Sequence, residues 1–202
     1  MAMNSKLNGK AVFLDRDGVL NPLIYHQEQG IIDSPFTAEQ FGLFPRAGQA
    51  IKKIREMGYR VVLVSNQPAI AKGHMAAEVF EKIREKMERE LNSEGTFLDA
   101  QYYCFHHPEA VIEDMKADCD CRKPAPGMLL RAAEELQIDL SRSWMIGDGI
   151  TDIQAGKGAG TRTILIGKMK CELCHHFSEK NCAPEAVCAS LMEAAGVIEA
   201  EG

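Results

Sequence analysis

Four charged side chains stand at positions from which they could transfer a phosphoryl group. Asp15 and Asp17 directly follow an apolar run, Asp148 follows another, and Lys123 is a cation available to offset them. Clustered carboxylates without histidine favour a hard cation, and Mg²⁺ is the usual choice beside phosphate. Mg²⁺ and a lysine offset the charge of phosphoryl oxygens, so that a carboxylate can attack phosphorus. The alternative for Asp15 and Asp17 is an ordinary polar turn.

A second polar group, Ser65-Asn66-Gln67, follows the apolar run 60–64. A hydroxyl and two amides can donate hydrogen bonds to an anion without carrying charge themselves. We therefore expect this segment to bind phosphate if it lies beside Asp15. A polar turn is again the alternative.

Two pairs of metal-binding residue types flank a loop. Cys104 and His106 form the first pair, Cys119 and Cys121 form the second, and twelve residues separate them. Three thiolates and one imidazole make a complete tetrahedral set for structural Zn²⁺. Such an ion would order the loop at 102–123 and position Lys123, which closely follows the second pair. The alternative is two unrelated groups of buried cysteines.

The elements that must carry these residues alternate between strand and helix. Apolar runs predict strands at 11–14, 60–64, 99–105, 144–146 and 163–166. Helical periodicity or helix-start signals predict helices at 46–57, 75–91, 126–136, 151–158 and 184–195. The alternation predicts an α/β fold with a Rossmann-like, doubly wound parallel sheet. Ligands of such sheets lie at the carboxyl ends of the strands, where the polar residues stand. The stretch 22–45 has no period and is predicted to be a substrate-facing loop.

Composition narrows the class of protein. The 202 residues fit one domain, and a net charge of −6 argues against nonspecific binding of nucleic acid. No apolar run is long enough to span a membrane, and the first ten residues lack the apolar core of a signal peptide. We expect a cytoplasmic monomer that acts on a small molecule. Seven cysteines cannot all pair with one another, and clustered cysteines in a reducing compartment more often bind metal.

Taken together, the motifs resemble the haloacid dehalogenase (HAD) superfamily of phosphohydrolases. In chain order they are Asp15-Arg16-Asp17-Gly18, Ser65-Asn66-Gln67, Lys123-Pro124 and Gly147-Asp148 with Asp152. The resemblance implies that Asp15 is the nucleophile and forms an aspartyl-phosphate, while Asp17 acts as acid and then base. It implies that Ser65 and Lys123 hold the phosphate. It also implies that Asp15, the backbone carbonyl of Asp17, and Asp148 ligate Mg²⁺.

The Cys/His loop narrows the resemblance to one branch of that superfamily. Residues 98–167 are similar to the heptose bisphosphate phosphatases, which lack a large cap domain and carry a structural zinc. The resemblance implies removal of the 7-phosphate of D-glycero-D-manno-heptose 1,7-bisphosphate, in the synthesis of bacterial surface glycans such as lipopolysaccharide. It also implies substrate contacts from Asn21, Ser65, Asn66, Gln67, Arg122 and Lys123. The alternative is histidinol phosphate or another small phosphoester, whose phosphatases in the related branch tend to have a shorter loop. A non-catalytic scaffold is disfavoured because the acids and the lysine are all present.

Three features depart from the resemblance. Ser65 stands where a threonine is more usual, the loop at 22–44 is longer, and Gly149 stands where a lysine is common. The tail at 168–202 lies outside the resemblance and carries Cys171, Cys174, His175, His176, Cys182 and Cys188. These side chains could form a second zinc site or a haem attachment site, or they could be unligated cysteines.

Overall fold

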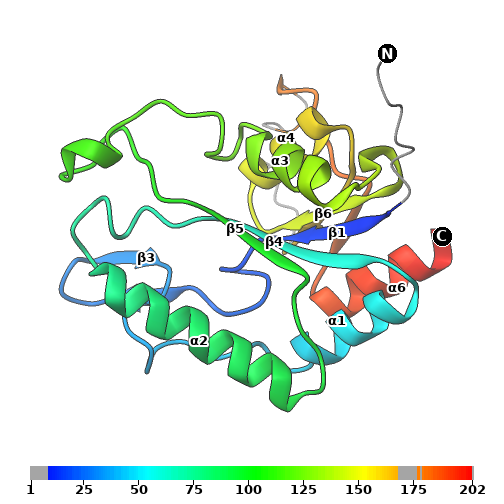
Figure 1. Cartoon of the computed structure of the whole chain (residues 1–202), viewed down its shortest axis with the longest axis horizontal. Coiled ribbons are helices and arrows are strands. Elements are labelled where there is room, and N and C mark those ends of the chain that lie inside the picture. Colours follow the sequence, from blue (N-terminus) through cyan, green and yellow to red (C-terminus); the bar gives the residue numbers. More distant parts are fainter. Residues whose placement is uncertain (1–8, 168–176, 178, 202) are drawn as a thin grey trace.

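The computed structural model describes residues 9–167, 177 and 179–201 (Figure 1). The strands are β1 Ala11–Leu14, β2 Ile24–His26, β3 Ile31–Asp33, β4 Arg60–Asn66, β5 Ala100–Cys104, β6 Trp144–Gly147, β7 Arg162–Ile166 and β8 Ala186–Cys188. The helices are α1 Ala47–Glu56, α2 Ala77–Ser93, α3 Gly127–Leu136, α4 Ile150–Ala159 and α6 Leu191–Glu201. Short 3₁₀ helices span Glu113–Met115 and Leu140–Arg142. Most predicted elements are confirmed to within two residues at each end.

The central sheet has six parallel strands in the order β5-β4-β1-β6-β7-β8. The first strand of the chain, β1, lies in the middle, with Phe13 opposite Val62 of β4 and Met145 of β6. This order brings the carboxyl ends of β4, β1 and β6 together at one edge. The predicted doubly wound parallel sheet is confirmed.

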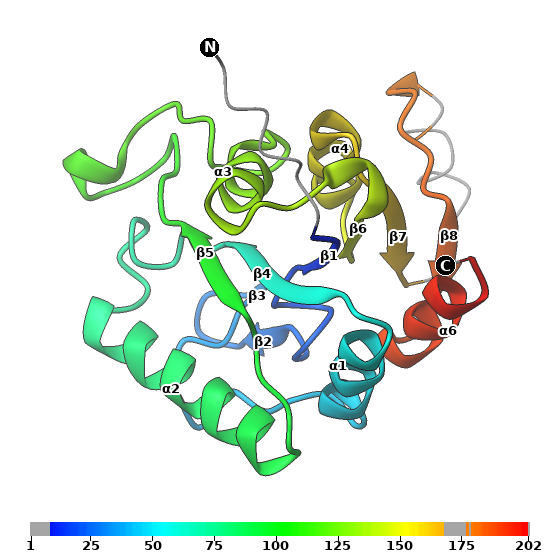
Figure 2. The same ribbon diagram turned by 45° about the vertical axis from the view of Figure 1, so that its right-hand side comes forward.

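Helices cover both faces of the sheet (Figures 1 and 2). Because successive side chains of a strand point to opposite faces, Val12 and Leu14 pack toward α1, α2 and α6. Ala11 and Phe13 pack on the other face, toward α3 and α4. This two-sided burial explains why β1 is apolar at every position and has no polar face.

Two segments differ from the sequence prediction. The predicted helix at 184–195 is wrong, because residues 186–188 form the edge strand β8 and the helix begins only at Leu191. Pairing of β8 with β7 produces this strand, and the sequence of a three-residue segment cannot reveal a neighbour. The stretch predicted as a loop contains the antiparallel hairpin β2–β3. That hairpin, inserted between β1 and α1, is far too small to be a large cap domain.

Within the part of the chain that the structure describes, no helix has the length and apolar character needed to cross a membrane. The tail residues Cys171, Cys174, His175 and His176 lie outside the described residues. Cys182 and Cys188 are described and are buried free thiols. The hypotheses of a second zinc site and of a haem attachment site therefore stay predictions.

Candidate active site

The three carboxylates that we call the acid cluster, Asp15, Asp148 and Asp152, meet at the carboxyl edge of the sheet. Asp15 is the first residue after β1, and its backbone N–H donates to the carbonyl of Ile146 in β6 at 3.0 Å. Carboxylate oxygens of the three residues all lie within 4.8 Å of one another. Neighbouring parallel strands thus bring together acids that are more than 130 positions apart in sequence. The cluster could hold a hard divalent cation.

Two glycines make room for this arrangement. Gly18 has a φ of +80°, and a Cβ there would collide with the carboxylate of Asp148. A Cβ on Gly147 would collide with the side chain of Asp152 in the same way. Any larger residue at either position would push the acids apart, so these glycines are needed for close approach.

Lys123 forms ion pairs with two members of the acid cluster. Its Nζ is 2.9 Å from Oδ1 of Asp15 and 2.7 Å from Oδ1 of Asp152, and it donates to the carbonyl of Val64 at 2.9 Å. The lysine is 2% exposed, so these partners, and not bulk water, stabilise its positive charge. Asp152 also accepts from the backbone N–H of Gly149 at 3.0 Å, which fixes it at the start of α4.

Burial and mutual repulsion shape the electrostatics of the acid cluster. Burial raises the pKa of Asp15 to about 6, with Lys123 opposing the shift and the neighbouring carboxylates adding to it. Burial also raises the pKa of Asp148 to about 7, helped by the charges of Asp15 and Asp152. Burial alone would lower the pKa of Lys123, but Asp15 and Asp152 together raise it. The acids therefore need more positive charge than Lys123 supplies, which a bound cation would provide.

The carboxylate of Asp17 is held apart from the acid cluster. Its oxygens accept hydrogen bonds from Arg16 at 3.2 Å, from the side-chain amide of Asn21 at 2.9 Å and from that of Gln67 at 2.7 Å. Gln67 also donates to Oγ of Ser65 at 3.0 Å. The side chain of Gln67 therefore links Asp17 to Ser65 by hydrogen bonds, and all three are predicted site residues.

The residues predicted to contact substrate divide into two groups. Asn21 and Gln67 are fully buried and hold Asp17 through their amides. Asn66 accepts from the backbone N–H of Lys123 and donates to its carbonyl, at 3.0 Å each, so it orients that segment. All three amides are engaged with protein groups, and so is the half-buried Arg122, which donates to the carbonyl of His106 at 3.2 Å.

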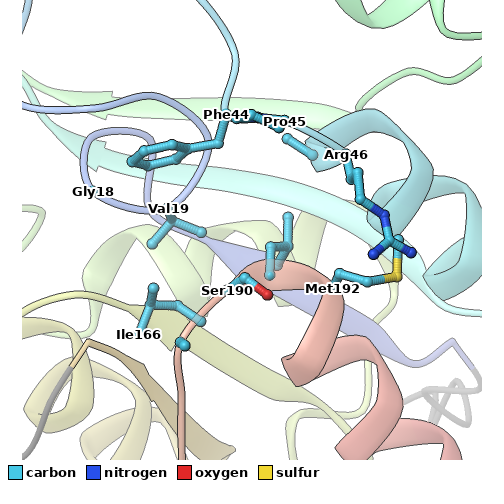
Figure 3. A pocket seen from close by; sticks show the side chains of 11 residues that line it. Gly18, Val19, Phe44, Pro45, Arg46, Ile166, Ser190 and Met192 are labelled. Carbon is cyan, nitrogen blue, oxygen red and sulfur yellow. The ribbon is translucent and has the colours of Figure 1, made fainter.

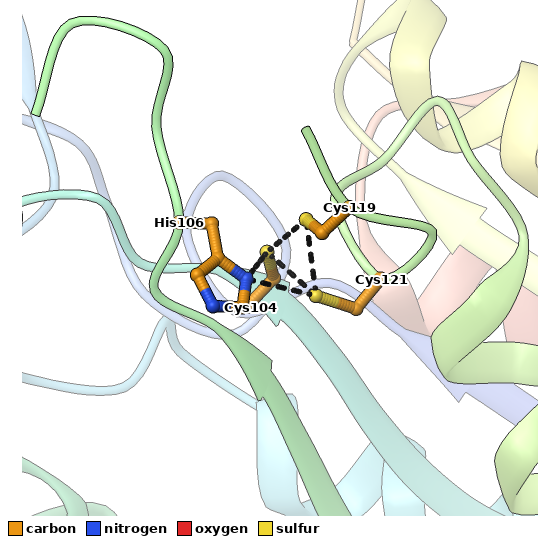
Figure 4. A group of neighbouring side chains, drawn as sticks. All are labelled: Cys104, His106, Cys119 and Cys121. Carbon is orange, nitrogen blue, oxygen red and sulfur yellow. Dashed lines mark hydrogen bonds between the residues drawn. The ribbon is translucent and has the colours of Figure 1, made fainter. Parts of the chain in front are cut away.

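The predicted Cys/His cluster, Cys104, His106, Cys119 and Cys121, comes together in space (Figure 4). Its sulfur atoms are 3.1, 3.3 and 3.6 Å apart, and Nδ1 of His106 lies 3.4 Å from Cys121 and 3.9 Å from Cys104. A tetrahedral ion with Zn–S bonds of about 2.3 Å separates its sulfur ligands by about 3.7 Å. The donors and their spacing therefore fit a metal ion of the size of zinc.

Known proteins similar to the chain identify its family. A curated D-glycero-beta-D-manno-heptose-1,7-bisphosphate 7-phosphatase of Pasteurella multocida is 43% identical over 161 residues, which are 79% of this chain and 82% of that protein. The chain belongs to this phosphatase family. The enzyme of the same name from Escherichia coli K12 is 39% identical over 153 residues, 76% of each chain. The predicted phosphatase family is thereby confirmed.

Structural and domain comparisons agree with this family. The D,D-heptose 1,7-bisphosphate phosphatase of B. bronchiseptica, solved with magnesium and phosphate, superposes with a TM-score of 0.76 and 29% identity. The match covers 96% of this chain and 99% of that one. The family model described as HAD-hydrolase-like matches residues 120–194. The chain is thus a HAD-like hydrolase of phosphate esters, as its motifs predicted.

Two residues of the site received no role from the sequence. Asp152 was noted within a motif, but only the structure shows that it pairs with Lys123. The sequence signal for Asp152 was its spacing of four residues from Asp148. One helical turn separates residues at this spacing, so both side chains can lie at the start of α4. Arg16 carried no signal, because an arginine between two aspartates is normally expected to be exposed.

A cavity of about 190 Å³ opens beside Gly18, on the side of α1 and α6 (Figure 3). Its walls are mainly apolar, from Val19, Phe44, Ile166 and Met192, with Arg46 and Ser190 as its polar side chains. A phosphorylated sugar needs many hydrogen-bond partners, which these walls do not offer. The cavity is therefore not assigned to the substrate.

Proposed function

We propose that this chain removes the 7-phosphate of D-glycero-beta-D-manno-heptose 1,7-bisphosphate. The observation that carries the chemistry is the position of Asp15, at the sheet edge and in contact with Lys123. The curated relatives of this family, named for that substrate, support its identity. A second candidate, histidinol phosphate, would use the same chemistry, and no specific contact in the structure favours it.

The reaction has two half-reactions. In the first, a carboxylate oxygen of Asp15 forms a bond to phosphorus, the ester P–O bond breaks, and Asp17 gives a proton to the leaving sugar oxygen. In the second, Asp17 takes a proton from a water molecule that attacks the same phosphorus. The bond from phosphorus to Asp15 then breaks and releases inorganic phosphate. Lys123, which touches Asp15, stabilises negative charge on the phosphoryl oxygens in both half-reactions.

Asp15 and Asp148 would hold Mg²⁺, together with the backbone carbonyl of Asp17. The fit rests on the donor set, since oxygen ligands suit Mg²⁺, and on the excess negative charge of the acid cluster. The ion would supply further positive charge to the phosphoryl group. The relative from B. bronchiseptica, solved with magnesium and phosphate, supports this assignment.

The Cys/His cluster would hold a structural Zn²⁺. Burial raises the pKa of Cys104 and, more strongly, that of Cys121, where contacts with the other two thiols add to the shift. Burial alone would raise the pKa of Cys119, but hydrogen bonds from Cys121 and Cys104 outweigh burial and lower that pKa, so this thiol ionises first. A divalent ion would stabilise the other two as thiolates. Because Cys121 is two residues from Lys123, the ion would also anchor the catalytic lysine.

The remaining assignments follow from this function. Ser65, Lys123 and neighbouring backbone amides would bind the transferred phosphate, and Arg122 would bind the rest of the sugar phosphate. Asn21, Asn66 and Gln67 would border the substrate while they orient Asp17 and Lys123. We propose that the enzyme acts as a single-domain monomer in the cytoplasm, with neither nucleic acid nor membrane as a partner.

The test is release of inorganic phosphate, with Mg²⁺, from both anomers of heptose 1,7-bisphosphate and from histidinol phosphate. We expect the beta anomer to give the highest kcat/KM and Asp15→Asn to give no turnover. The matched control is Asp139→Asn, a half-buried aspartate far from the acid cluster in sequence that caps a short 3₁₀ helix. Preferred turnover of histidinol phosphate would keep the chemistry and refute the proposed substrate.

A further inference from the structure

Arg16 is a buried cation that the proposed reaction does not use. It is 0% exposed and lies within the motif Asp15-Arg16-Asp17, between the proposed nucleophile and the proposed acid. An arginine is rarely buried completely unless it has a specific partner, because removing its charge from water is costly. The partner of Arg16 should therefore explain why the residue is there.

The guanidinium of Arg16 clamps the carboxylate of Asp17. Nε donates to both carboxylate oxygens at 3.2 Å, and Nη2 lies 3.2 Å from Oδ1 and 3.1 Å from Oδ2. Nη1 is buried without a hydrogen-bond partner among the described residues. The side chain thus leaves one of its own nitrogens unsatisfied while it is committed to Asp17.

Gln67 closes the clamp into a ring. Its Oε1 accepts from Nη2 of Arg16 at 2.8 Å, and its Nε2 donates to Oδ2 of Asp17 at 2.7 Å and to Oγ of Ser65 at 3.0 Å. Asn21 donates to the other oxygen of Asp17. Rotation of the Asp17 carboxylate would break several of these bonds together, so its orientation is tightly determined.

The ring also separates Asp17 from the acid cluster. The positive charge beside the acid cluster comes from Lys123. The carboxylate of Asp17 instead accepts hydrogen bonds from Arg16, Asn21 and Gln67. Without Arg16, nothing cationic among the described contacts of Asp17 would keep it there, and Lys123 and a bound cation would compete for its carboxylate. A carboxylate drawn to that side could not serve the leaving oxygen.

We propose that Arg16 is a positioning residue, which, with Gln67, holds the carboxylate of Asp17 where it exchanges protons with the leaving oxygen and with water. The proposal rests on the proposed function of Asp17. The guanidinium of Arg16 acts only through Asp17, whereas its backbone N–H, which a substitution of the side chain keeps, donates to Oδ1 of Asp15 at 2.7 Å. Ser65, which is tied to the same ring, links the position of Asp17 to the phosphate-binding end of β4.

The experiment compares two substrates that differ in their need for a proton. The sugar alkoxide of heptose 1,7-bisphosphate must be protonated as it leaves, whereas the p-nitrophenolate of p-nitrophenyl phosphate leaves without a proton. For Arg16→Met we expect kcat on the heptose ester to fall by about 100-fold, with KM changed by less than about threefold. On p-nitrophenyl phosphate we expect a burst of about one p-nitrophenolate per active site, followed by slow turnover.

This burst separates positioning from a merely structural role. Formation of the aspartyl-phosphate from p-nitrophenyl phosphate does not need Asp17, but its hydrolysis does, so the intermediate accumulates. General damage to the fold would slow both substrates alike and give no burst. Arg131→Met, which removes a mostly exposed arginine on α3, is the matched control and should behave as wild type.

The variant Gln67→Met keeps the ion pair of Arg16 with Asp17 but removes the hydrogen bonds that link this pair to Ser65. It can therefore test the proposal if Arg16→Met does not fold. We expect roughly a tenfold loss of kcat on the heptose ester and a smaller burst. Folded variants that keep kcat on the heptose ester within about threefold of wild type would overturn the proposal. Equal losses on both substrates without a burst would also overturn it.

A crystal structure of Arg16→Met tests the positioning without any substrate. We expect the Asp17 carboxylate to leave Asn21 and Gln67, and a carboxylate that stays in place would refute the proposal. If wild type hydrolyses p-nitrophenyl phosphate but not the heptose ester, the proposed substrate fails, and the burst still tests Arg16. If wild type hydrolyses neither, the proposed function fails as a whole, and the crystal structure alone decides the position of Asp17.

Discussion

The acid cluster and the Cys/His cluster can each hold a metal ion, but the fold supports them differently. Asp15 and Asp148 directly follow the central strands β1 and β6, and Asp152 lies in the first turn of α4, so regular backbone structure fixes all three acids. The Cys/His cluster joins the end of edge strand β5 to a loop, and three of its residues, His106, Cys119 and Cys121, lie outside helices and strands. A cluster built on strand ends should persist without its ion, whereas a cluster that ties a loop should depend on its ion.

Asp15→Asn should have the largest effect on activity and a small effect on the fold. Removing the proposed nucleophile should lower kcat by on the order of 10⁴-fold or more, because the proposed aspartyl-phosphate could no longer form. The melting temperature should change by only a few degrees, because the backbone around residue 15 belongs to the sheet. Calorimetry beside a phosphate-release assay measures both effects. A collapse of the melting temperature would mean that the acid cluster also supports the fold.

Lys123→Met should be the next most damaging change. We expect kcat to fall by about 1,000-fold, because the methionine leaves Asp15 and Asp152 without their shared cation. The zinc content should stay at that of wild type, since Lys123 is not a ligand of the Cys/His cluster. Elemental analysis beside steady-state kinetics checks both. Loss of zinc in this variant would show that the two clusters fold as one unit.

Cys119→Ser should show the opposite pattern. We expect zinc to be lost and the melting temperature to fall by several degrees, because the loop at 102–123 loses its cross-link. The kcat should drop by roughly 10- to 100-fold through displacement of Lys123. Cys188→Ser, at a buried free cysteine in β8, is the control and should keep its zinc. A Cys119→Ser protein with full zinc content would remove that residue from the ligand set.

Metal removal should separate the clusters without mutation. Mild chelation with EDTA should abolish activity, and added Mg²⁺ should restore it fully, because the strand ends keep the acids in place. Stripping zinc under denaturing conditions should instead lower the melting temperature, and Mg²⁺ alone should restore no more than about a tenth of the activity. Thermal melts and assays after each treatment test this. Recovery of the zinc-stripped protein with Mg²⁺ alone would contradict the structural role of zinc.

Asp152→Asn should have the smallest effect. Lys123 would keep Asp15 and the carbonyl of Val64 as partners, so we expect kcat to fall by only about tenfold. The amide oxygen of asparagine can still accept from the backbone N–H of Gly149, which preserves the start of α4. A loss of kcat as large as that of Lys123→Met would mean that Asp152 itself is a ligand of the proposed Mg²⁺.

Much of the fold could be predicted because its strands are buried on both faces. Such strands are apolar at nearly every position, as 11–14 and 61–64 are, and the helices between them show clear periodicity. The edge strand β8 and the hairpin β2–β3 could not be predicted. Each of these three strands is only three residues long, and hydrogen bonds to a neighbouring strand, more than local preference, make the segments strands.

The sequence by itself determined the chemistry of this protein. Asp15, Lys123 and Asp148 follow strand or loop motifs whose order was sufficient to indicate a phosphatase, and the spacing of the cysteines indicated a metal site. Only the tertiary structure decided which groups are partners. The buried pair of Arg16 and Asp17, and the ion pair of Lys123 with Asp152, depend on loops meeting at one sheet edge. The energy of a charge depends on what surrounds it, and only the folded chain creates that surrounding.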